Sequence, residues 1–364
     1  MKRLLIALAI AGLAGTGVAR ADVTFGTPKL LGQFILPTGV SFEGVEFGGI
    51  SGLDYDPKND VYYGVSDDRS EHGPARFYVL KLKIDDKGVH GLDIVKTVPL
   101  KDADGKEFAI KSIDPESIRF DAATGHLFWS SEGDAAGNPG IYEATTDGAL
   151  VRSFKLPDYY LPNADHTQGV VDNASFESLS LSKDGKFLYA GLENGLVQDG
   201  GKTTLDAGSL SRILKLDLAS GAVAAEYPLE IEKIPNKASN GKTNDNGMSE
   251  FMLLSDDTFL TMERSFALGY GNEINFYTAK IAGASDVAGK PVIKDMGATP
   301  AAKQKVMQIR EGDFGLDIDN IECLTWGPMI DGKPTIVIAA DNNFNPNGEY
   351  NQFVVLTLDG FKAE

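Results

Sequence analysis

Pairs of short apolar runs joined by a polar turn recur five times along the chain. The copies begin at Gly48, Asp114, Ser175, Gly247 and Asp319. In each copy the second run is rich in aromatic and β-branched residues, as in HLFWSS from His126. Short runs of this composition, bounded by Asp, Asn, Ser and Gly, predict β-hairpins. The chain is therefore expected to be built from a repeated hairpin, and nothing after residue 21 sustains a helical period over more than a few turns.

Two further strand-like runs follow each hairpin and are joined by a tight turn. Asp147-Gly148 and Ser220-Gly221 are two such turns. Four antiparallel strands per repeat make the blade of a β-propeller, so the sequence predicts an all-β propeller of five four-stranded blades. The long segments 195–247 and 281–320 leave room for a sixth blade.

The two ends of the chain are expected to meet in one blade. After the fifth hairpin, only one more strand-like run follows, from Gln352. Residues 23–36, which read VTFGTPKLLGQFIL, can supply the missing fourth strand. This N-terminal strand would close the ring and remove the exposed sheet edges.

The first 21 residues have the pattern of a secretory signal peptide. Lys2 and Arg3 precede an apolar run, and Ala19 and Ala21 form an A-x-A cleavage site. Cleavage after Ala21 would leave residues 22–364 as a single propeller domain in the periplasm or outside the cell. No other stretch approaches the ~20 apolar residues of a transmembrane helix, so no stable membrane anchor is expected.

The charge of the chain limits its partners. Of its 34 basic residues, three lie in the predicted signal peptide, which leaves 31 against 52 acidic residues and a net charge of −21. Such a molecule repels nucleic acid and anionic membranes and attracts metal cations. Cys323 is the only cysteine, so no internal disulfide stabilises the fold. The protein is expected to act as a monomer on a small molecule.

Acidic residues flank the predicted hairpins at both ends. Strand one opens with Glu116, Glu177, Glu250 and Glu322, and strand two ends with Asp67, Glu132, Glu193, Glu263 and Asp341. In a propeller the connections that enter strand one and leave strand two share a face, and here they include the long loops. These carboxylates are therefore expected to meet at one mouth of the central channel.

Carboxylates crowded at one mouth need a counter-charge. Each pair at ~4 Å costs about 4 kcal/mol at an effective dielectric constant of ~20. A hard divalent cation, most suitably Ca²⁺, fits a set of carboxylate ligands, for which the candidates are Glu116, Glu177, Glu250, Glu322, Asp67 and Asp341. Two other interpretations stay open: the acids only lock neighbouring blades together, or they bind a cationic ligand.

A few basic and amide residues near the acids are candidates for binding a substrate. Arg69, His72, Arg76 and Arg264 can hold phosphate or carboxylate oxygens, or they can pair with adjacent acids. Asn342 offers an amide beside Asp341, although DNN also reads as an Asx turn. His166, in the loop NADHTQG, is a candidate general acid or base.

The acidic segments also carry a family resemblance. GVSDDR from Gly64, DPES from Asp114, FESLSLSKDG from Phe176, MER from Met262, and NIE from Asn320 with DNNF from Asp341 resemble the phytase-like family described as having esterase-like activity. The resemblance spans about Gly48 to Leu356. It implies a secreted bacterial propeller that hydrolyses esters, with phosphomonoesters as the first candidates.

For metal-assisted ester hydrolysis, Glu193 or Glu132 would take the proton of the attacking water. The sequence contains no G-x-S-x-G, no H-E-x-x-H and no complete EF-hand loop, which excludes several other hydrolase and calcium-binding classes. Two alternatives remain. One is a propeller that binds a ligand or protein without catalysis, and the other is a calcium-dependent lactonase or carboxylesterase.

Overall fold

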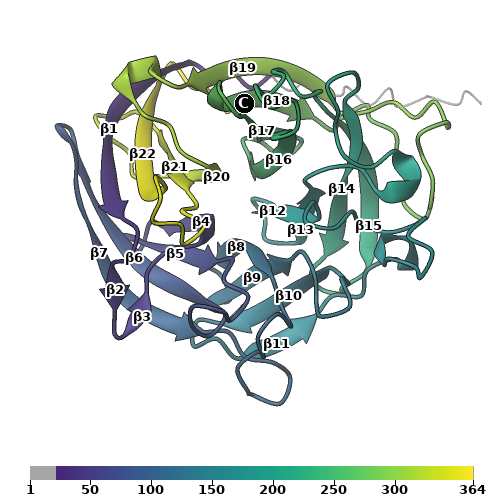
Figure 1. Cartoon of the computed structure of the whole chain (residues 1–364), viewed down its shortest axis with the longest axis horizontal. Helices are drawn as coiled ribbons and strands as arrows, with labels where there is room; N and C mark the ends of the chain where they lie inside the picture. Colours follow the sequence, from purple (N-terminus) through teal and green to yellow (C-terminus); the bar gives the residue numbers. More distant parts are fainter. Residues whose placement is uncertain (1–21, 364) are drawn as a thin grey trace, which may run out of the picture.

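The computed structural model describes residues 22–363; the predicted signal peptide, residues 1–21, lies outside them. Five four-stranded antiparallel sheets are arranged radially around one axis (Figure 1). The predicted five-bladed propeller is confirmed. Segments 195–247 and 281–320 contain outer strands of blades 3 and 4 and long connections, and no sixth blade occurs in the part of the chain that the structure describes.

The blades follow the order of the chain. Blade 1 contains β4 (Ile50–Asp56), β5 (Val61–Ser66), β6 (Arg76–Asp85) and β7 (Gly88–Pro99). Blade 2 contains β8 (Pro115–Asp121), β9 (His126–Ser131), β10 (Gly140–Thr145) and β11 (Leu150–Ser153). Blade 3 contains β12 (Phe176–Leu181), β13 (Phe187–Leu192), β14 (Ser209–Asp217) and β15 (Val223–Ile231). Blade 4 contains β16 (Asn244–Leu253), β17 (Thr258–Ala267), β18 (Gly271–Lys280) and β19 (Ala302–Arg310).

Blade 5 joins the two ends of the chain. It contains β20 (Ile321–Trp326), β21 (Thr335–Ala340), β22 (Tyr350–Asp359) and, as its outermost strand, β1 (Thr27–Pro37). β1 runs antiparallel to β22 over its whole length, which confirms the predicted closing strand. The backbone groups on the outer edge of β22 are thus satisfied, and the pairing of the two ends of the chain closes the ring.

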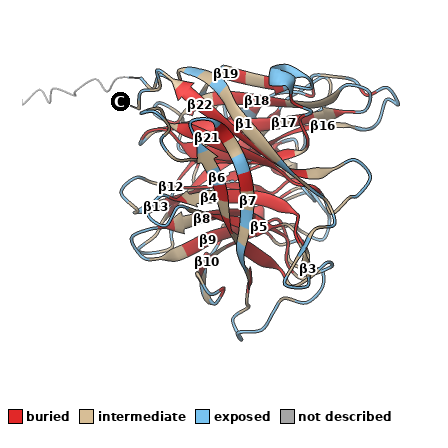
Figure 2. Ribbon diagram, turned by 90° about the vertical axis from the view of Figure 1, so that its left-hand side faces the viewer, coloured by how far each residue is buried: buried red, intermediate tan, exposed pale blue. Residues whose placement is uncertain are grey.

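The core lies between the blades. Five clusters of buried apolar side chains each join two neighbouring blades. Cys323, for example, is fully buried in the cluster between blades 5 and 1. Figure 2 shows the same distribution: buried residues concentrate in the strands, and exposed residues in the connections. Because each blade needs both neighbours to cover its faces, the ring stabilises itself only when complete.

Regular structure outside the blades is short. A two-stranded hairpin, β2 (Ser41–Phe42) and β3 (Val45–Glu46), precedes blade 1. Three single turns of 3₁₀ helix lie in the connections: η1 (Asp158–Tyr160), η2 (Val197–Asp199) and η3 (Asp313–Gly315). Over residues 22–363, no helix has the length and apolar character needed to cross a membrane.

Candidate functional site

Every inner strand has a β-bulge near its start. The register of the first hairpin shifts after Ile50, Pro115, Phe176, Met248 and Ile321. A bulge leaves a residue without a partner on the next strand and changes the direction of its side chain. The first residues freed in this way are Ser51, Glu116, Glu177, Ser249 and Glu322. Blades 2, 3 and 5 therefore have a glutamate where blades 1 and 4 have a serine.

The second strand of each hairpin also has an equivalent position in every blade. This position directly follows the residue that pairs with the last residue before the bulge. The partners of the five pre-bulge residues are Ser66, Ser131, Leu192, Glu263 and Ala340. The next residue is then Asp67, Glu132, Glu193, Arg264 and Asp341, respectively. Four blades supply a carboxylate at this position and blade 4 supplies a guanidinium.

In blade 4, the positions of the acids differ from the sequence prediction. Glu250 and Glu263 were expected to match the other acids, but the register places both of them one residue out of step. The error arose because Glu250 and Glu263 were matched by residue type, although they are 13 residues apart where Glu116 and Glu132, like Glu177 and Glu193, are 16 apart. Glu250 is fully buried next to Arg119, with Oε2 2.7 Å from Nη2, and it accepts a hydrogen bond of 3.0 Å from Ser117. Glu263 pairs with Lys303 and accepts from the Glu232 amide.

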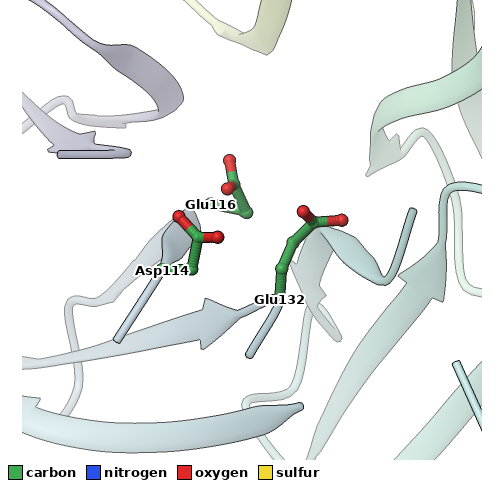
Figure 3. Close-up of side chains that lie close together, drawn as sticks. All are labelled: Asp114, Glu116 and Glu132. Carbon is green, nitrogen blue, oxygen red and sulfur yellow. The ribbon is translucent and has the colours of Figure 1, made fainter. Parts of the chain in front are cut away.

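Six of the nine predicted acids gather at one mouth of the channel, in what we call the acidic depression; Glu193 is not among the residues that line it. It has a volume of about 250 Å³ and is lined by Asp67, Asp68, Arg69, Glu71, His72, Asp114, Glu116, Glu132, Asn173, Glu177, Glu322, Asp341, Asn343 and Phe344. Figure 3 shows Asp114, Glu116 and Glu132 with their carboxylates turned toward a common space. The predicted meeting of carboxylates from successive blades at a single mouth is thus seen in the structure.

Burial and mutual repulsion make these carboxyl groups hard to ionise. Burial, with the charges of neighbouring acids added, raises the pKa values of Asp67, Glu116 and Glu177 well above their ordinary range. Burial raises the pKa of Glu132 to about 7 and that of Asp114 to about 6. At neutral pH the site therefore binds protons or another source of positive charge.

Two groups of three carboxylates have the spacing of a metal site. Asp114, Glu116 and Glu132 each offer an oxygen within 4.8 Å of the others, and so do Glu132, Glu177 and Glu193. Glu132 belongs to both groups. Among the described residues, Oδ1 of Asp67 is buried and has no hydrogen-bond partner. Asp67 belongs to neither group, but it lines the same depression. Sets of carboxylate oxygens fit a hard divalent cation such as Ca²⁺.

Local backbone features position the shared ligand and its neighbour. The Ser175 amide donates a hydrogen bond of 2.6 Å to Glu132 Oε1. The backbone of Glu132 is tied to the Asp114 carbonyl at 2.9 Å. Gly247, on blade 4, leaves space for Glu193, because a Cβ there would lie 2.1 Å from Glu193 Oε1. The carboxylates of blades 2 and 3 thus have defined places before any ligand binds.

The structure separates the basic candidates. Arg69 and His72 line the acidic depression; Arg69 Nε lies 3.5 Å from Asp114 Oδ2, and the His72 ring stacks on Phe344 at 4.2 Å. Arg76 is fully buried, 2.5 Å from Asp68 Oδ2, and also donates to Tyr78. Its guanidinium stabilises the loop behind the depression and is not available to a substrate.

Arg264 lies between the acids of blades 4 and 5. Its terminal nitrogens are 3.7 Å from Asp245 Oδ1 and 3.7 Å from Glu322 Oε1, and its Nε is buried and has no hydrogen-bond partner in residues 22–363. The guanidinium is a fixed positive charge beside one half of the ring. Both candidate metal-binding groups lie on blades 2 and 3, and two members of one group, Glu177 and Glu193, interact electrostatically with Arg264.

Asn342 and His166 lie outside the acidic depression. The Asn342 side chain is fully buried, accepts from the Gly49 amide at 2.9 Å and donates to Thr38 at 2.9 Å. These bonds hold the loop after β21 to the start of blade 1, in place of the expected substrate contact. His166 is exposed and lines an adjoining cavity of about 340 Å³, which Arg69, Asp114 and Glu132 also line.

Sequence reasoning missed several residues of the depression, above all Asp114, Asn173 and Phe344. Asp114 had a signal, because it directly precedes strand one in DPES and its carbonyl pairs with the Glu132 amide. Asn173 and Phe344 come from long loops whose course no local pattern specifies.

Comparisons with known proteins give one family. The model of the family described as phytase-like, esterase-like activity of phytase, matches residues 45–344. No curated protein matches the chain. The solved structures that are similar include the Dos1 propeller, with 10% identity over 85% of this chain and 68% of that chain and a TM-score of 0.35.

Two further similar structures are known. Hydrazine synthase from Kuenenia stuttgartiensis has 12% identity over 85% of this chain and 84% of that chain, with a TM-score of 0.36. The bifunctional GH43-CE protein of Bacteroides eggerthii has 12% identity over 87% of this chain and 34% of that chain, with a TM-score of 0.44. Likenesses this distant say nothing about chemistry.

Proposed function

The chain belongs to the phytase-like family, and from that premise we propose that it hydrolyses ester bonds with the help of a divalent cation, Ca²⁺ being the best match. The observation that supports this most is the two groups of three carboxylates that share Glu132, a residue that lines the acidic depression. Asp114, Glu116 and Glu132, with Glu177 and Glu193, would hold the cation. When bound, it would polarise the ester and lower the pKa of a water molecule.

The residues around the cation would move protons. Glu132 has a pKa of about 7 in the cation-free protein. Whichever of Glu132 and Glu193 does not hold the cation would accept the proton of the attacking water. Glu193 lies in the same group of carboxylates and also has a raised pKa, caused mainly by burial. His166, on the rim of the adjoining cavity, would give a proton to the departing alcohol.

The wider assignments are part of the same proposal. The signal-like residues 1–21 favour a periplasmic or secreted protein. A net charge of −18 for the full chain favours a small molecule over nucleic acid as the partner. We further propose that the protein works as a monomer.

A binding propeller without catalysis is the second candidate. Four basic side chains were expected to hold a substrate, and two of them, Arg76 and Arg264, instead form ion pairs with acids of the protein. This favours the second candidate. The first candidate has the advantage that Arg69 and His166 line one cavity together with Asp114 and Glu132.

Hydrolysis of p-nitrophenyl esters by the purified protein, after EDTA treatment and after addition of Ca²⁺, tests the proposal. We expect turnover only with the cation, and its loss in Glu132→Gln and Glu177→Gln. Glu230→Gln, on the exposed end of β15, is the matched control and should behave as the wild type. Absence of cation-dependent turnover with acyl and phosphate esters alike would leave the binding propeller as the better explanation.

A further inference from the structure

A second cavity lies beside the acidic depression, at the junction of blades 4 and 5, which are neighbours in the ring (Figure 1). Its volume is about 410 Å³. We call it the amide pocket, because four asparagines line it: Asn272, Asn320, Asn343 and Asn347. Asn343 lines the acidic depression as well. The two spaces therefore adjoin, although different side chains form most of their walls.

The asparagines give the amide pocket both hydrogen-bond donors and acceptors, since each side chain carries an NH₂ group and a carbonyl oxygen. Asn272 donates through Nδ2 to the Ile318 carbonyl at 3.2 Å, which leaves its own oxygen as an acceptor. Asn343 and Asn347 are exposed. A ligand whose neighbouring atoms both donate and accept matches this wall better than a metal ion or a phosphate does.

The acids of the amide pocket have partners within the protein. Asp319 accepts a hydrogen bond of 2.9 Å from the Tyr350 amide. Burial, with a hydrogen bond to the Asp317 carboxyl, raises the pKa of Glu311. Within residues 22–363, no acid of this pocket belongs to a group with the spacing of a metal site. The free lone pairs of these acids can instead accept from hydroxyl groups.

The guanidinium of the amide pocket is not free to hold an anion. Arg264 lies 3.7 Å from Asp245 and 3.7 Å from Glu322. A phosphate or carboxylate group would have to displace one of these acids before it could form a two-point contact with the guanidinium. The pocket therefore favours an uncharged group that carries several hydroxyls.

Aromatic side chains add an apolar surface. Phe266 and Tyr350 line the pocket, and the Tyr350 hydroxyl donates to the Asp317 carbonyl at 2.7 Å, which fixes its ring. Phe314 belongs to the loop between Glu311 and Asp317, both of which line the pocket, and it is 46% exposed. Its φ of 56° lies in the left-handed region, which is unfavourable for a bulky side chain. Strain of this kind is common at binding sites.

We propose that the amide pocket binds an uncharged sugar unit. Hydroxyl groups and C–H groups alternate around a sugar ring, so one unit can bond to the asparagines and acids and also pack one face on the aromatic side chains. The pocket contains none of the residues of the two candidate cation groups. Sugar binding is therefore independent of ester hydrolysis.

Saturation-transfer NMR and calorimetric titration of the full protein in EDTA test the proposal. The probes are neutral disaccharides of glucose, xylose, galactose, mannose and N-acetylglucosamine. Spermidine and inorganic phosphate serve as charged competitors. We expect at least one disaccharide to bind, and we expect neither charged compound to displace it.

Two variants locate the bound sugar. Asn347→Ala should weaken binding of that disaccharide roughly fivefold, the effect of one lost hydrogen bond. Phe314→Gly should also weaken it, yet the thermal midpoint should stay unchanged or rise, because glycine adopts a φ of 56° without strain. A purely structural role of Phe314 would not produce this combination. Met329→Ala, at a 61% exposed position between β20 and β21, is the control and should change neither quantity.

The outcomes separate sugar binding from the proposed function. Binding of none of the disaccharides, an affinity that neither variant lowers, or displacement of the sugar by spermidine or phosphate would overturn the proposal. Each of these results would leave ester hydrolysis as it stands. Absence of ester hydrolysis would equally leave sugar binding intact.

Discussion

Raising the pH of the cation-free protein should destabilise it, because it ionises carboxylates that are crowded and buried. Burial, with the nearby charge of Glu193, raises the pKa of Glu132 from 4.5 to about 7. The folded protein therefore binds this proton more tightly than the unfolded chain does. The stabilisation is complete below pH ~4.5 and is lost as the pH rises through about 7.

The size of the effect follows from the two pKa values. Their difference for Glu132 corresponds to about 3 kcal/mol of unfolding free energy. The carboxyl groups of Glu116 and Glu177 have pKa values raised well above the ordinary one by burial and by each other, and they contribute with the same sign. Because these groups titrate together, the loss belongs to the whole set of carboxyl groups, and about 3 kcal/mol is its order of magnitude.

Urea denaturation in EDTA at pH values of about 5 and about 8 measures this loss, and the same experiment with saturating Ca²⁺ measures its reversal. We expect Ca²⁺ to restore most of the stability at the higher pH, since the cation replaces the protons. Glu132→Gln should reduce the pH dependence, and the exposed Glu230→Gln should not. The reasoning would be refuted by a cation-free protein whose unfolding free energy is constant or increases between these two pH values.

Three substitutions give further predictions. Arg119→Met should lower the unfolding free energy by about 3 to 5 kcal/mol in urea denaturation, because it leaves the Glu250 carboxylate buried without its cation. Adding Glu250→Leu should recover much of the lost stability. A mild effect of Arg119→Met alone would contradict the prediction. Arg264→Gln should increase Ca²⁺ affinity in calorimetric titration, because it removes a fixed positive charge that interacts with the proposed ligands Glu177 and Glu193. Arg264→Lys should stay close to the wild type. Gly247→Ala should weaken Ca²⁺ binding, because the added Cβ would displace the Glu193 carboxylate. The expected loss of affinity is roughly tenfold, the typical effect of disturbing the surroundings of a ligand. An affinity equal to that of the wild type would show that Glu193 is not a ligand.

The residues differ in how far their places could be predicted. Glu116, Glu177 and Glu322 could be placed at one mouth because a strand with a period of two, repeated in every blade, brings equivalent positions to equivalent places. Glu250 was misplaced because blade 4 has Ser249 at the equivalent position; Glu250 follows one residue later and pairs with Arg119. His72 and Arg76 stand only four residues apart, yet one lines the depression and the other is buried behind it.

The sequence by itself determined the four-stranded blade, its five copies and the closing strand, because hairpin patterns and turn residues are local and repeat along the chain. That segments 195–247 and 281–320 add no sixth blade was decided by the structure. It also determined that acids from several blades meet. The tertiary structure alone decided which acids form groups close enough for one ion, that Arg264 takes the fifth place in the ring, and that further cavities adjoin the acids. These features depend on one-residue bulges and on long loops packed across blades, and neither leaves a periodic trace in the chain.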